Sequence, residues 1–247
     1  MKYFAKIKYL GTAFHGFQVQ PGLRTVQGEL NAGLNQAFGL PCKVTGCSRT
    51  DAGVHANEFC LSVECDGATI PADKLPIAVA RFLPEDLSLF YAEECDTDFH
   101  PRYDVKEKEY LYRIINRPIY DPFEYGRAWF LSRPINDRGL EMMRRAASHF
   151  IGKKDFCTFM SEGSDVEDTV RNITSLAVER SGDLIEIRIC ADGFLYNMVR
   201  IIVGTLTEVA FGRISPDDIP NIIESHNRAR AGMTAPAEGL YLNKVIY

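Results

Sequence analysis

The stretch KEYLYRII, residues 108–115, decides how the chain divides into folding units. Its side chains alternate so that Tyr110, Tyr112 and Ile114 share one face, which predicts a strand with one buried face. The chain before this stretch already predicts a full series of strands and helices, and the chain after it predicts a similar series. The stretch is therefore expected to be the first strand of a second half.

The series before this stretch has the order β-α-β-β-α-β. A helix is predicted over residues 25–38 from the apolar spacing, with Thr25 as its N-cap and Gly39 as its stop. A short helix is predicted over residues 72–83. The strands are predicted over KYFAKIKYL (2–10), residues 42–47, residues 59–65 and LSLFYAEE (87–94).

The series after residue 107 predicts the same order with additions. Its strands are predicted over KEYLYRII (108–115), YGRAWFL (125–131), TVRNITSLAVER (169–180), LIEIRICA (184–191) and GLYLNKVIY (239–247). Its helices are predicted over 137–151, capped by Asn136 and closed by Gly152, and over 194–210 and 217–226.

Two such series predict an α+β protein of two ferredoxin-like halves, residues 1–104 and 105–247. The halves are expected to form a continuous, mostly antiparallel sheet, with helices on one side and a central cleft.

The composition is that of a soluble globular protein. The 247 residues are 46% hydrophobic and 25% charged, and no apolar run reaches membrane-spanning length. The N-terminus carries no secretory signal, so a cytoplasmic location is expected. Seven cysteines, an odd number, fit a reducing compartment. The pairs Cys42/Cys47 and Cys60/Cys65 resemble a zinc framework only loosely, because no Cys-x-x-Cys occurs, and we predict buried thiols and no metal.

The charge is unevenly distributed along the chain. The net charge of −5 argues at first against a nucleic-acid partner. Residues 1–50, however, hold six Lys or Arg and one Asp or Glu, whereas residues 51–100 hold two and eleven. Two interpretations remain open. Either the protein has a basic face although its net charge is negative, or the asymmetry is accidental because the two stretches intermingle in the folded protein.

The stretch SRTDAG, residues 48–53, places an arginine two residues before an aspartate. In an extended segment Arg49 and Asp51 point to the same side, and a nearby guanidinium keeps a carboxylate ionised. An ionised aspartate beside an electrophile is a competent nucleophile. The alternative reading is a surface turn, since Asp-x-Gly is common turn chemistry.

Two further stretches carry polar groups in apolar surroundings. FLYNMVRIIVGTL, residues 194–206, has Arg200 as its only charge, which indicates either a buried cation that needs an anion or a side chain that reaches out to solvent. Tyr110 and Tyr112 share a strand face, where they either stack on a base or pack under a helix. The Asp-x-Asp pair in DTDFH, residues 96–100, is a weak match to magnesium-dependent aspartyl phosphatases.

Five stretches taken together resemble the tRNA pseudouridine synthase A (TruA) family over nearly the whole chain. They are YLGTAFHGFQVQP with TVQGEL, SRTDAGVHA, FHPRYDVKEKEYLYRI, DGFLYNMVRIIVGTL and APAEGLYL, in the family's order. The chain departs from the usual family pattern at Ser48, where glycine is common, and at Phe17, in the Phe-x-Gly-Trp-Gln motif. Neither departure changes an ionisable residue.

The resemblance implies an enzyme that isomerises uridine to pseudouridine at positions 38 to 40 of the tRNA anticodon stem-loop, without metal or cofactor. It implies Asp51 as the nucleophile, Arg49 and Arg200 as its pairing arginines, Tyr110 in the active site and Leu240 lining the pocket. It also implies a homodimer that binds tRNA.

The reaction leaves several routes open. Asp51 can attack carbon six of the base or the anomeric carbon of the sugar, or it can abstract a sugar proton to give a glycal. Tyr110 is expected to stack rather than act as a base, because a tyrosine with an ordinary pKa near 10 is a weak base at neutral pH. A catalytically silent RNA-binding module remains the alternative. Candidate RNA contacts are Lys6, Lys8, Arg24, His55, His100, Arg102, Lys153 and Lys154.

Overall fold

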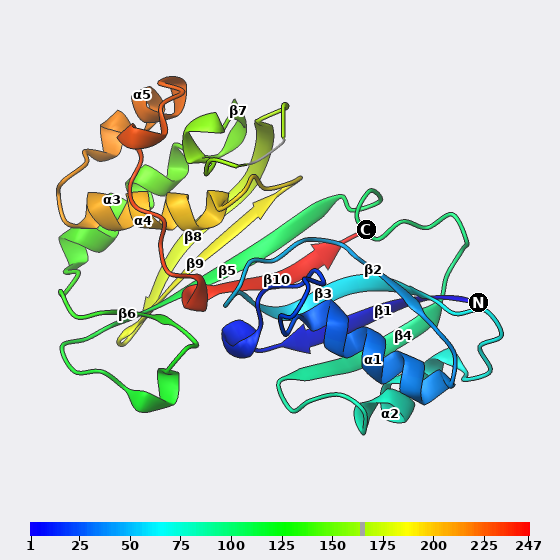
Figure 1. Ribbon diagram of the computed structural model, residues 1–247. Helices are drawn as coiled ribbons and strands as arrows, with labels where there is room; N and C mark the ends of the chain where they lie inside the picture. The colour runs from blue at the N-terminus through cyan, green and yellow to red at the C-terminus, as the bar shows by residue number, and fades with distance from the viewer. Residues whose placement is uncertain (164–165) are drawn as a thin grey trace. The chain divides into compact units, whose positions relative to one another are not determined.

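The computed structural model describes residues 1–163 and 166–247, and they divide into two compact units (Figure 1). Unit 1 comprises Met1–Lys106 together with Tyr241–Tyr247, and unit 2 comprises Glu107–Leu240. The expected boundary after residue 104 falls close to the first of these breaks. Residues 241–247, expected in the second half, lie in unit 1, because their strand pairs with a strand of that unit.

Unit 1 has the predicted order β-α-β-β-α-β. Its elements are β1 (Lys2–Tyr9), α1 (Val26–Phe38), β2 (Lys43–Gly46), β3 (His55–Glu64), α2 (Leu75–Ala80) and β4 (Leu87–Glu94), with β10 (Leu240–Ile246) added at the end of the chain. Short 3-10 turns occupy Gly11–Ala13 and Ala72–Lys74. The strand order is β4-β1-β3 with antiparallel neighbours.

Strand β3 has two partners on its second edge. β2 pairs with it in the antiparallel sense, from Lys43 opposite Glu64 to Gly46 opposite Leu61. β10 pairs in the parallel sense near the start of β3, where Tyr241 lies opposite His55. The two ends of β3 therefore bind strands from distant parts of the sequence.

Helix α1 forms for the reasons that its sequence predicts. Thr25 Oγ1 accepts the Gly28 N–H at 3.3 Å, and Gly39 ends the helix in the left-handed region at φ 67°. Val26, Leu30 and Leu34 are fully buried at helical spacing. The helix packs with α2, and Figure 1 shows it lying across the sheet of unit 1.

Unit 2 is a second antiparallel sheet with its own helices. Its elements are β5 (Glu107–Asn116), β6 (Trp129–Leu131), α3 (Asp137–Ser148), β7 (Gly152–Asp155), β8 (Val170–Ser181), β9 (Leu184–Ala191), α4 (Met198–Ala210) and α5 (Ile219–Glu224). Short 3-10 turns occupy Pro122–Glu124, Cys157–Phe159, Pro216–Asp218, Arg228–Arg230 and Ala237–Gly239. The strand order is β5-β9-β8-β7, and β6 runs parallel to the end of β5.

Unit 2 departs from the predicted elements at three places. The helix expected to reach residue 151 ends at Ser148, and Gly152 at φ 102° begins the unpredicted strand β7 instead of closing the helix. The helix expected from residue 194 begins at Met198, because Asn197 is left-handed at φ 60°. The strand expected over 125–131 is reduced to Trp129–Leu131.

The fold class is α+β, as predicted, with mostly antiparallel strands. The β-α-β-β-α-β series is complete in unit 1. In unit 2 it lacks its final strand, because β10 falls almost entirely within unit 1. Among residues 1–163 and 166–247, no helix is both long and apolar enough to span a membrane.

Candidate active site

Asp51 lies on the segment that joins β2 to β3, and its neighbour Thr50 fixes this segment to the core. The Thr50 hydroxyl and the Tyr9 hydroxyl are 2.8 Å apart in the buried interior. The Thr50 carbonyl accepts the Phe17 N–H at 3.0 Å, and a turn follows in which Val54 N–H donates to the Asp51 carbonyl. The backbone of Asp51 is therefore held from both sides.

Two glycines let the segment pack this tightly. A Cβ at Gly11 would lie 2.0 Å from the Val54 carbonyl oxygen, and one at Gly16, which has φ +84°, would lie 2.8 Å from the Thr50 carbonyl oxygen. No real side chain tolerates such distances to backbone. The GTAFHG sequence is therefore a clamp for the segment that carries Asp51, a role that its sequence alone did not indicate.

The side chains of the segment alternate as expected of extended chain. Thr50 is buried, Arg49 is exposed and Asp51 is half-buried. Arg49 makes no ion pair or hydrogen bond with any residue in the described part of the chain, Asp51 included. The expected Arg49–Asp51 pairing is thus not formed in this structure, and Arg49 instead lines a pocket.

Phe17, one of the two departures from the family pattern, belongs to the core. Its ring stacks on Phe59 with centroids 4.3 Å apart. A Cβ at Gly46 would lie 2.6 Å from the Phe17 ring, so the ring occupies the space that a side chain at position 46 would need. Ser48, the other departure, is half-buried and lines the same pocket as Arg49.

In unit 2, Arg200 lies on the first turns of α4 with its guanidinium fixed by neutral oxygens. Its Nε donates to the Ala235 carbonyl at 2.6 Å, and one terminal nitrogen donates to the Asn197 side-chain oxygen at 2.7 Å. The Ala235 N–H donates back to the Arg200 carbonyl. Arg200 is half-buried. The hydrogen bonds to these neutral oxygens offset part of the cost of placing a cation in apolar surroundings.

The segment before β10 is packed as tightly as the clamp in unit 1. The Tyr112 hydroxyl donates to the Pro236 carbonyl at 2.7 Å, and a Cβ at Gly239 would lie 2.5 Å from the Tyr112 ring. Burial holds the pKa of Tyr112 well above its usual value, with nearby Arg200 opposing the shift. Tyr112 is therefore a structural residue, and Leu240, which is buried, follows directly from this anchored segment.

Tyr110 is the second aromatic residue of the β5 face. Its side chain is buried, with 8% of its surface exposed. Its ring meets Phe194 edge to face, with centroids 4.9 Å apart. The aromatic residues of FLYNMVR and of KEYLYRI thus lie in contact within unit 2.

The candidate RNA contacts fall into two groups. Those committed to protein partners include Arg24, which binds both Asp86 carboxylate oxygens at 2.8 Å, and Lys154, whose ammonium donates to the carbonyls of His149 and Ile151. His55 is fully buried, with Nδ1 accepting the Gly11 N–H and its ring stacked on Tyr241, so in this structure its side chain offers no exposed surface to RNA. Lys6 also has a protein partner, Glu58, and Lys8 lies over the Phe90 ring.

The second group comprises candidates that are exposed or half-exposed and have no ion pair among described residues. They are His100, Arg102 and Lys153.

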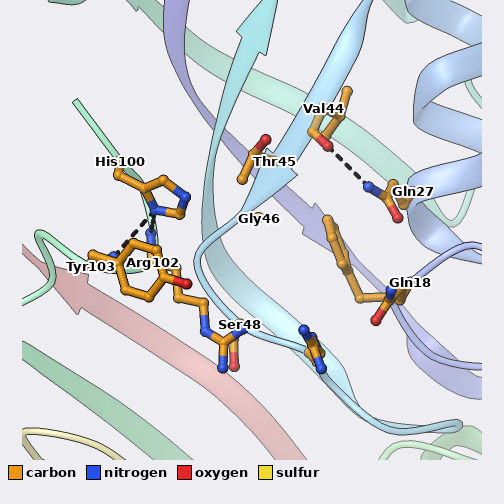
Figure 2. Close-up of a pocket in the computed structure, with 11 residues that line it drawn as sticks. Gln18, Gln27, Val44, Thr45, Gly46, Ser48, His100, Arg102 and Tyr103 are labelled. Atoms are coloured by element: carbon orange, nitrogen blue, oxygen red, sulfur yellow. Dashed lines mark hydrogen bonds between the residues drawn. The ribbon is translucent and has the colours of Figure 1, made fainter. Parts of the chain in front are cut away.

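A pocket of about 250 Å³ in unit 1 brings three separate stretches together (Figure 2). It lies between the 17–18 stretch, strand β2 with the following residues, and the turn at 100–103. Its lining residues are Phe17, Gln18, Gln27, Val44, Thr45, Gly46, Ser48, Arg49, His100, Arg102 and Tyr103. Sequence reasoning identified three of them as candidates and missed Gln18 and Tyr103, although both lie in the quoted motifs.

One group of described residues has metal-ligand types close together. The ligand atoms of Asp155, Cys157 and His226 lie within 4.8 Å of one another. Asp155 already accepts hydrogen bonds from the Thr169 hydroxyl and the Cys157 N–H, and it pairs with His226 at 3.6 Å. These contacts account for the group without a metal. The cysteines of the suspected zinc framework are not in it.

The Asp-x-Asp pair of DTDFH is placed unlike a phosphatase site. Asp96 and Asp98 are exposed and follow β4, an outer strand of the antiparallel sheet in unit 1. No group of potential metal ligands in the described residues includes either of them. The arrangement gives no support to a magnesium-dependent phosphatase.

Comparison with known proteins finds the same resemblance along nearly the whole chain. The sequence profile of a family described as tRNA pseudouridine synthase matches residues 5–104 and 146–247. The chain is 44% identical over 242 residues to tRNA pseudouridine synthase A of Acetivibrio thermocellus, and 42% identical over 241 residues to the proteins of that name from Thermoanaerobacter sp. (strain X514) and Brevibacillus brevis. Each alignment covers 98% of this chain and 97% of the relative.

Among solved structures, a chain from the crystal structure of a Cbf5-Nop10-Gar1 complex aligns with 97% of this chain and 48% of that chain. The identity is 12% and the TM-score is 0.39, and a likeness this low carries no argument.

Proposed function

Because the chain belongs to the tRNA pseudouridine synthase family, whose members are isomerases, we propose that it converts uridine to pseudouridine in the tRNA anticodon stem-loop. The proposed targets are positions 38 to 40, with Asp51 as the nucleophile and no metal or cofactor. The observation that carries the assignment of Asp51 is its place on the clamped segment between β2 and β3. An acid held by its backbone, half-buried and followed by Ala52 and Gly53, can meet a flat ligand without rearranging.

The chemistry requires one bond to be broken and another to be formed on the same base. The bond from the sugar's anomeric carbon to nitrogen one is cut, the base turns, and the same sugar carbon bonds to carbon five. Carbon five then loses a proton to solvent, and nitrogen one gains a proton. Asp51 acts at carbon six, at the anomeric carbon or on a sugar proton, and each route starts from its carboxylate form.

Three residues of unit 2 have roles in the proposed reaction. Arg200 contributes a positive charge whose orientation is fixed by Ala235 and Asn197, which suits stabilisation of charge that develops during reaction. Tyr110 stacks on the extruded base, which offsets part of the few kcal/mol that unstacking costs. Leu240 supplies an apolar wall.

The test is tritium release from tRNA labelled at carbon five of uridine, measured with and without a chelator. We expect release by the wild-type protein and a fall on the order of 10⁴-fold or more for Asp51→Asn. Asp66→Asn serves as the matched control, because Asp66 is an exposed turn residue of the same unit without an ion pair among described residues.

Each alternative outcome is informative. Equal release by wild type and Asp51→Asn would remove Asp51 as the nucleophile. Retained tRNA binding without release by any variant would favour the RNA-binding module. Release that the chelator abolishes would show that a metal takes part.

We also propose that the protein acts as a cytoplasmic homodimer, on the strength of the family resemblance. All seven cysteines are free thiols, which fits a reducing compartment. Sedimentation equilibrium at micromolar concentration tests the dimer, and a single species of 27.8 kDa would contradict it.

A further inference from the structure

The pocket beside Arg49 is basic, although the protein as a whole is acidic. Its eleven lining residues include Arg49, Arg102 and His100 and no Asp or Glu. Two other pockets formed by described residues, of about 460 and 330 Å³, contain acids, namely Asp155 with Glu224 and Glu179 with Glu186. Charge rather than size therefore distinguishes the pocket in Figure 2.

The two arginines of this pocket are left without acidic partners. Neither Arg49 nor Arg102 forms an ion pair or side-chain hydrogen bond with a residue in the described part of the chain. Arg24 of the same unit, by contrast, binds two acids, Glu29 and Asp86. Two like charges that share a concave surface repel one another, and an anion between them removes the repulsion and fills both planar forks.

The turn that carries Arg102 is rigid before any ligand arrives. His100 Nδ1 accepts the N–H groups of Arg102 and Tyr103, at 3.2 and 3.4 Å, and Asp104 accepts the His100 N–H at 2.8 Å. The Tyr247 hydroxyl donates to the Pro101 carbonyl. Because Nδ1 is an acceptor, the proton of the neutral ring lies on Nε2, which is a further donor. These bonds fix the backbone that carries the Arg102 guanidinium.

The same turn presents an aromatic surface. The Tyr103 side chain is 75% exposed, and its ring centroid lies 4.2 Å from that of His100 and 6.0 Å from the Arg102 guanidinium carbon. Figure 2 shows His100, Arg102 and Tyr103 on one side of the pocket and Gln18 and Gln27 on the other. Gln27 is held by Val44, whereas Gln18 is exposed. An exposed tyrosine next to cations suits the stacking of a nucleobase.

We infer that this pocket binds the nucleotide next to the target uridine, with its phosphodiester between Arg49 and Arg102 and its base against Tyr103. The inference rests on the proposed function, because Arg49 lies two residues from Asp51. The pocket volume, slightly below the range of sites that enclose a whole small ligand, fits part of a chain whose remainder stays outside. Arg49 then holds the substrate instead of pairing with Asp51 in the free protein.

The experiment couples single protein charges to single RNA charges. Stem-loop RNAs containing the target uridine carry one uncharged methylphosphonate at a time, at the phosphates on either side of it. For the wild-type protein we expect one of these changes to weaken binding about tenfold. Arg102→Gln should weaken binding of the unmodified RNA by a similar factor and should be insensitive, within about twofold, to that same methylphosphonate.

Arg81→Gln is the matched control. Arg81 is exposed, lies in unit 1, has no ion pair among described residues and stacks over its neighbour Phe82 at 4.5 Å, as Arg102 does over Tyr103. This variant should bind like wild type and keep the full methylphosphonate effect. Equal sensitivity of Arg102→Gln and wild type at both phosphates would overturn the inference.

Two further arms separate the parts of the inference. An abasic nucleotide beside the target should weaken binding to wild type and Tyr103→Phe, and leave Tyr103→Ala unaffected, because phenylalanine keeps the stacking ring. Inorganic phosphate that competes at the concentration of the RNA would indicate an anion site independent of RNA and would overturn the assignment. Tritium release by wild type from these RNAs distinguishes the proposals: its absence sinks the proposed function, whereas release without coupling sinks this inference alone.

Discussion

Arg49 in unit 1 and Arg200 in unit 2 show two ways in which a protein can prepare an arginine. Arg200 is half-buried and has its fork set by the Ala235 carbonyl and the Asn197 side chain. Arg49 is exposed, and no described residue accepts a hydrogen bond from it. The backbone around Arg49, by contrast, is clamped by Thr50. One arginine has a fixed side chain, and the other has a fixed backbone and a free side chain.

This difference indicates what each arginine does. A cation whose orientation the protein sets in advance costs nothing to reorganise during reaction, and this suits catalysis. A cation that the protein leaves without an acceptor keeps its hydrogen-bonding capacity for a ligand, and this suits binding of a phosphate. Substitutions of the two should therefore change different kinetic parameters.

The largest expected effect is on the rate at saturating RNA. Arg200→Lys should lower the single-turnover rate on the order of 10³-fold, because an ammonium cannot reproduce two divergent N–H bonds in the same place. Arg49→Gln should mainly weaken RNA binding and lower the slope of log affinity against log salt by about one.

Tritium release at saturating tRNA and filter binding at several salt concentrations measure the two quantities. Equal losses of rate for Arg200→Lys and Arg49→Gln, with unchanged salt slopes, would contradict the comparison. Arg138→Gln, an exposed arginine of α3 without an ion pair among described residues, controls for the loss of one charge in unit 2.

The second effect concerns the clamp itself. Gly11→Ala should destabilise the protein by about 3 kcal/mol or more, because its Cβ would lie 2.0 Å from the Val54 carbonyl oxygen and the segment would have to move. Gly22→Ala is the control: Gly22 has a positive φ of 72° but open space around it, so only a backbone cost of about 1 kcal/mol is expected.

Urea unfolding of the three proteins measures these free energies. If Gly11→Ala costs no more than Gly22→Ala, the segment that carries Asp51 is not clamped. A folded Gly11→Ala variant with much reduced activity would instead support a clamp that positions Asp51.

The local elements could be read from sequence because their causes are local. Helix α1 follows from Thr25, Gly39 and three apolar residues at helical spacing, and each of these holds in the structure. Arg49, Asp51 and Arg200 could also be selected as candidates from the sequence, since a cation in an apolar stretch and a small-residue Asp segment are unusual, and their roles in the reaction are proposals.

The remainder depends on contacts between distant residues. The parallel pairing of Tyr241 with His55 places β10 in unit 1 and buries His55, which composition alone would put on the surface. The basic pocket joins three stretches that are separate in sequence. The late start of α4 depends on the left-handed Asn197, whose side chain binds Ser161 and Arg200. Neither hydrophobic periodicity nor amino-acid composition predicts these long-range contacts.

The third effect tests whether Tyr110 is a stacking residue or a base. Tyr110→Phe keeps the ring and its edge-to-face contact with Phe194, so it should lower tritium release by less than about tenfold. Tyr110→Ala removes both and should lower release by considerably more. A loss of 10³-fold or greater for Tyr110→Phe would favour a proton-transfer role instead. Tyr112→Phe should leave the rate unchanged and lower only stability, because that hydroxyl is bonded to Pro236.

The smallest expected effect extends the comparison to the group of Asp155, Cys157 and His226. Burial alone would raise the pKa of Asp155, but hydrogen bonds from Thr169 and Cys157, with the charge of His226, outweigh burial and lower it. By the argument applied to the two arginines, a carboxylate satisfied in this way is structural and does not await a metal. Added zinc or chelator should therefore leave the melting temperature of the wild-type protein unchanged.

A lowered carboxyl pKa stabilises the fold above the ordinary pKa of an aspartate, near 3.9, and this contribution is lost as the pH falls through the lowered value. Thr169→Val removes one hydrogen bond at nearly constant volume. It should cost no more than about 1 kcal/mol at pH 7, because about a third of the Asp155 side chain is exposed and solvent screens the interaction. Near pH 3 the difference between variant and wild type should shrink. A cost of Thr169→Val that is independent of pH would show that Thr169 acts through packing. In the zinc experiment, a rise in melting temperature that Cys157→Ser abolishes would show that polar groups with protein hydrogen-bond partners do bind ligands in this protein.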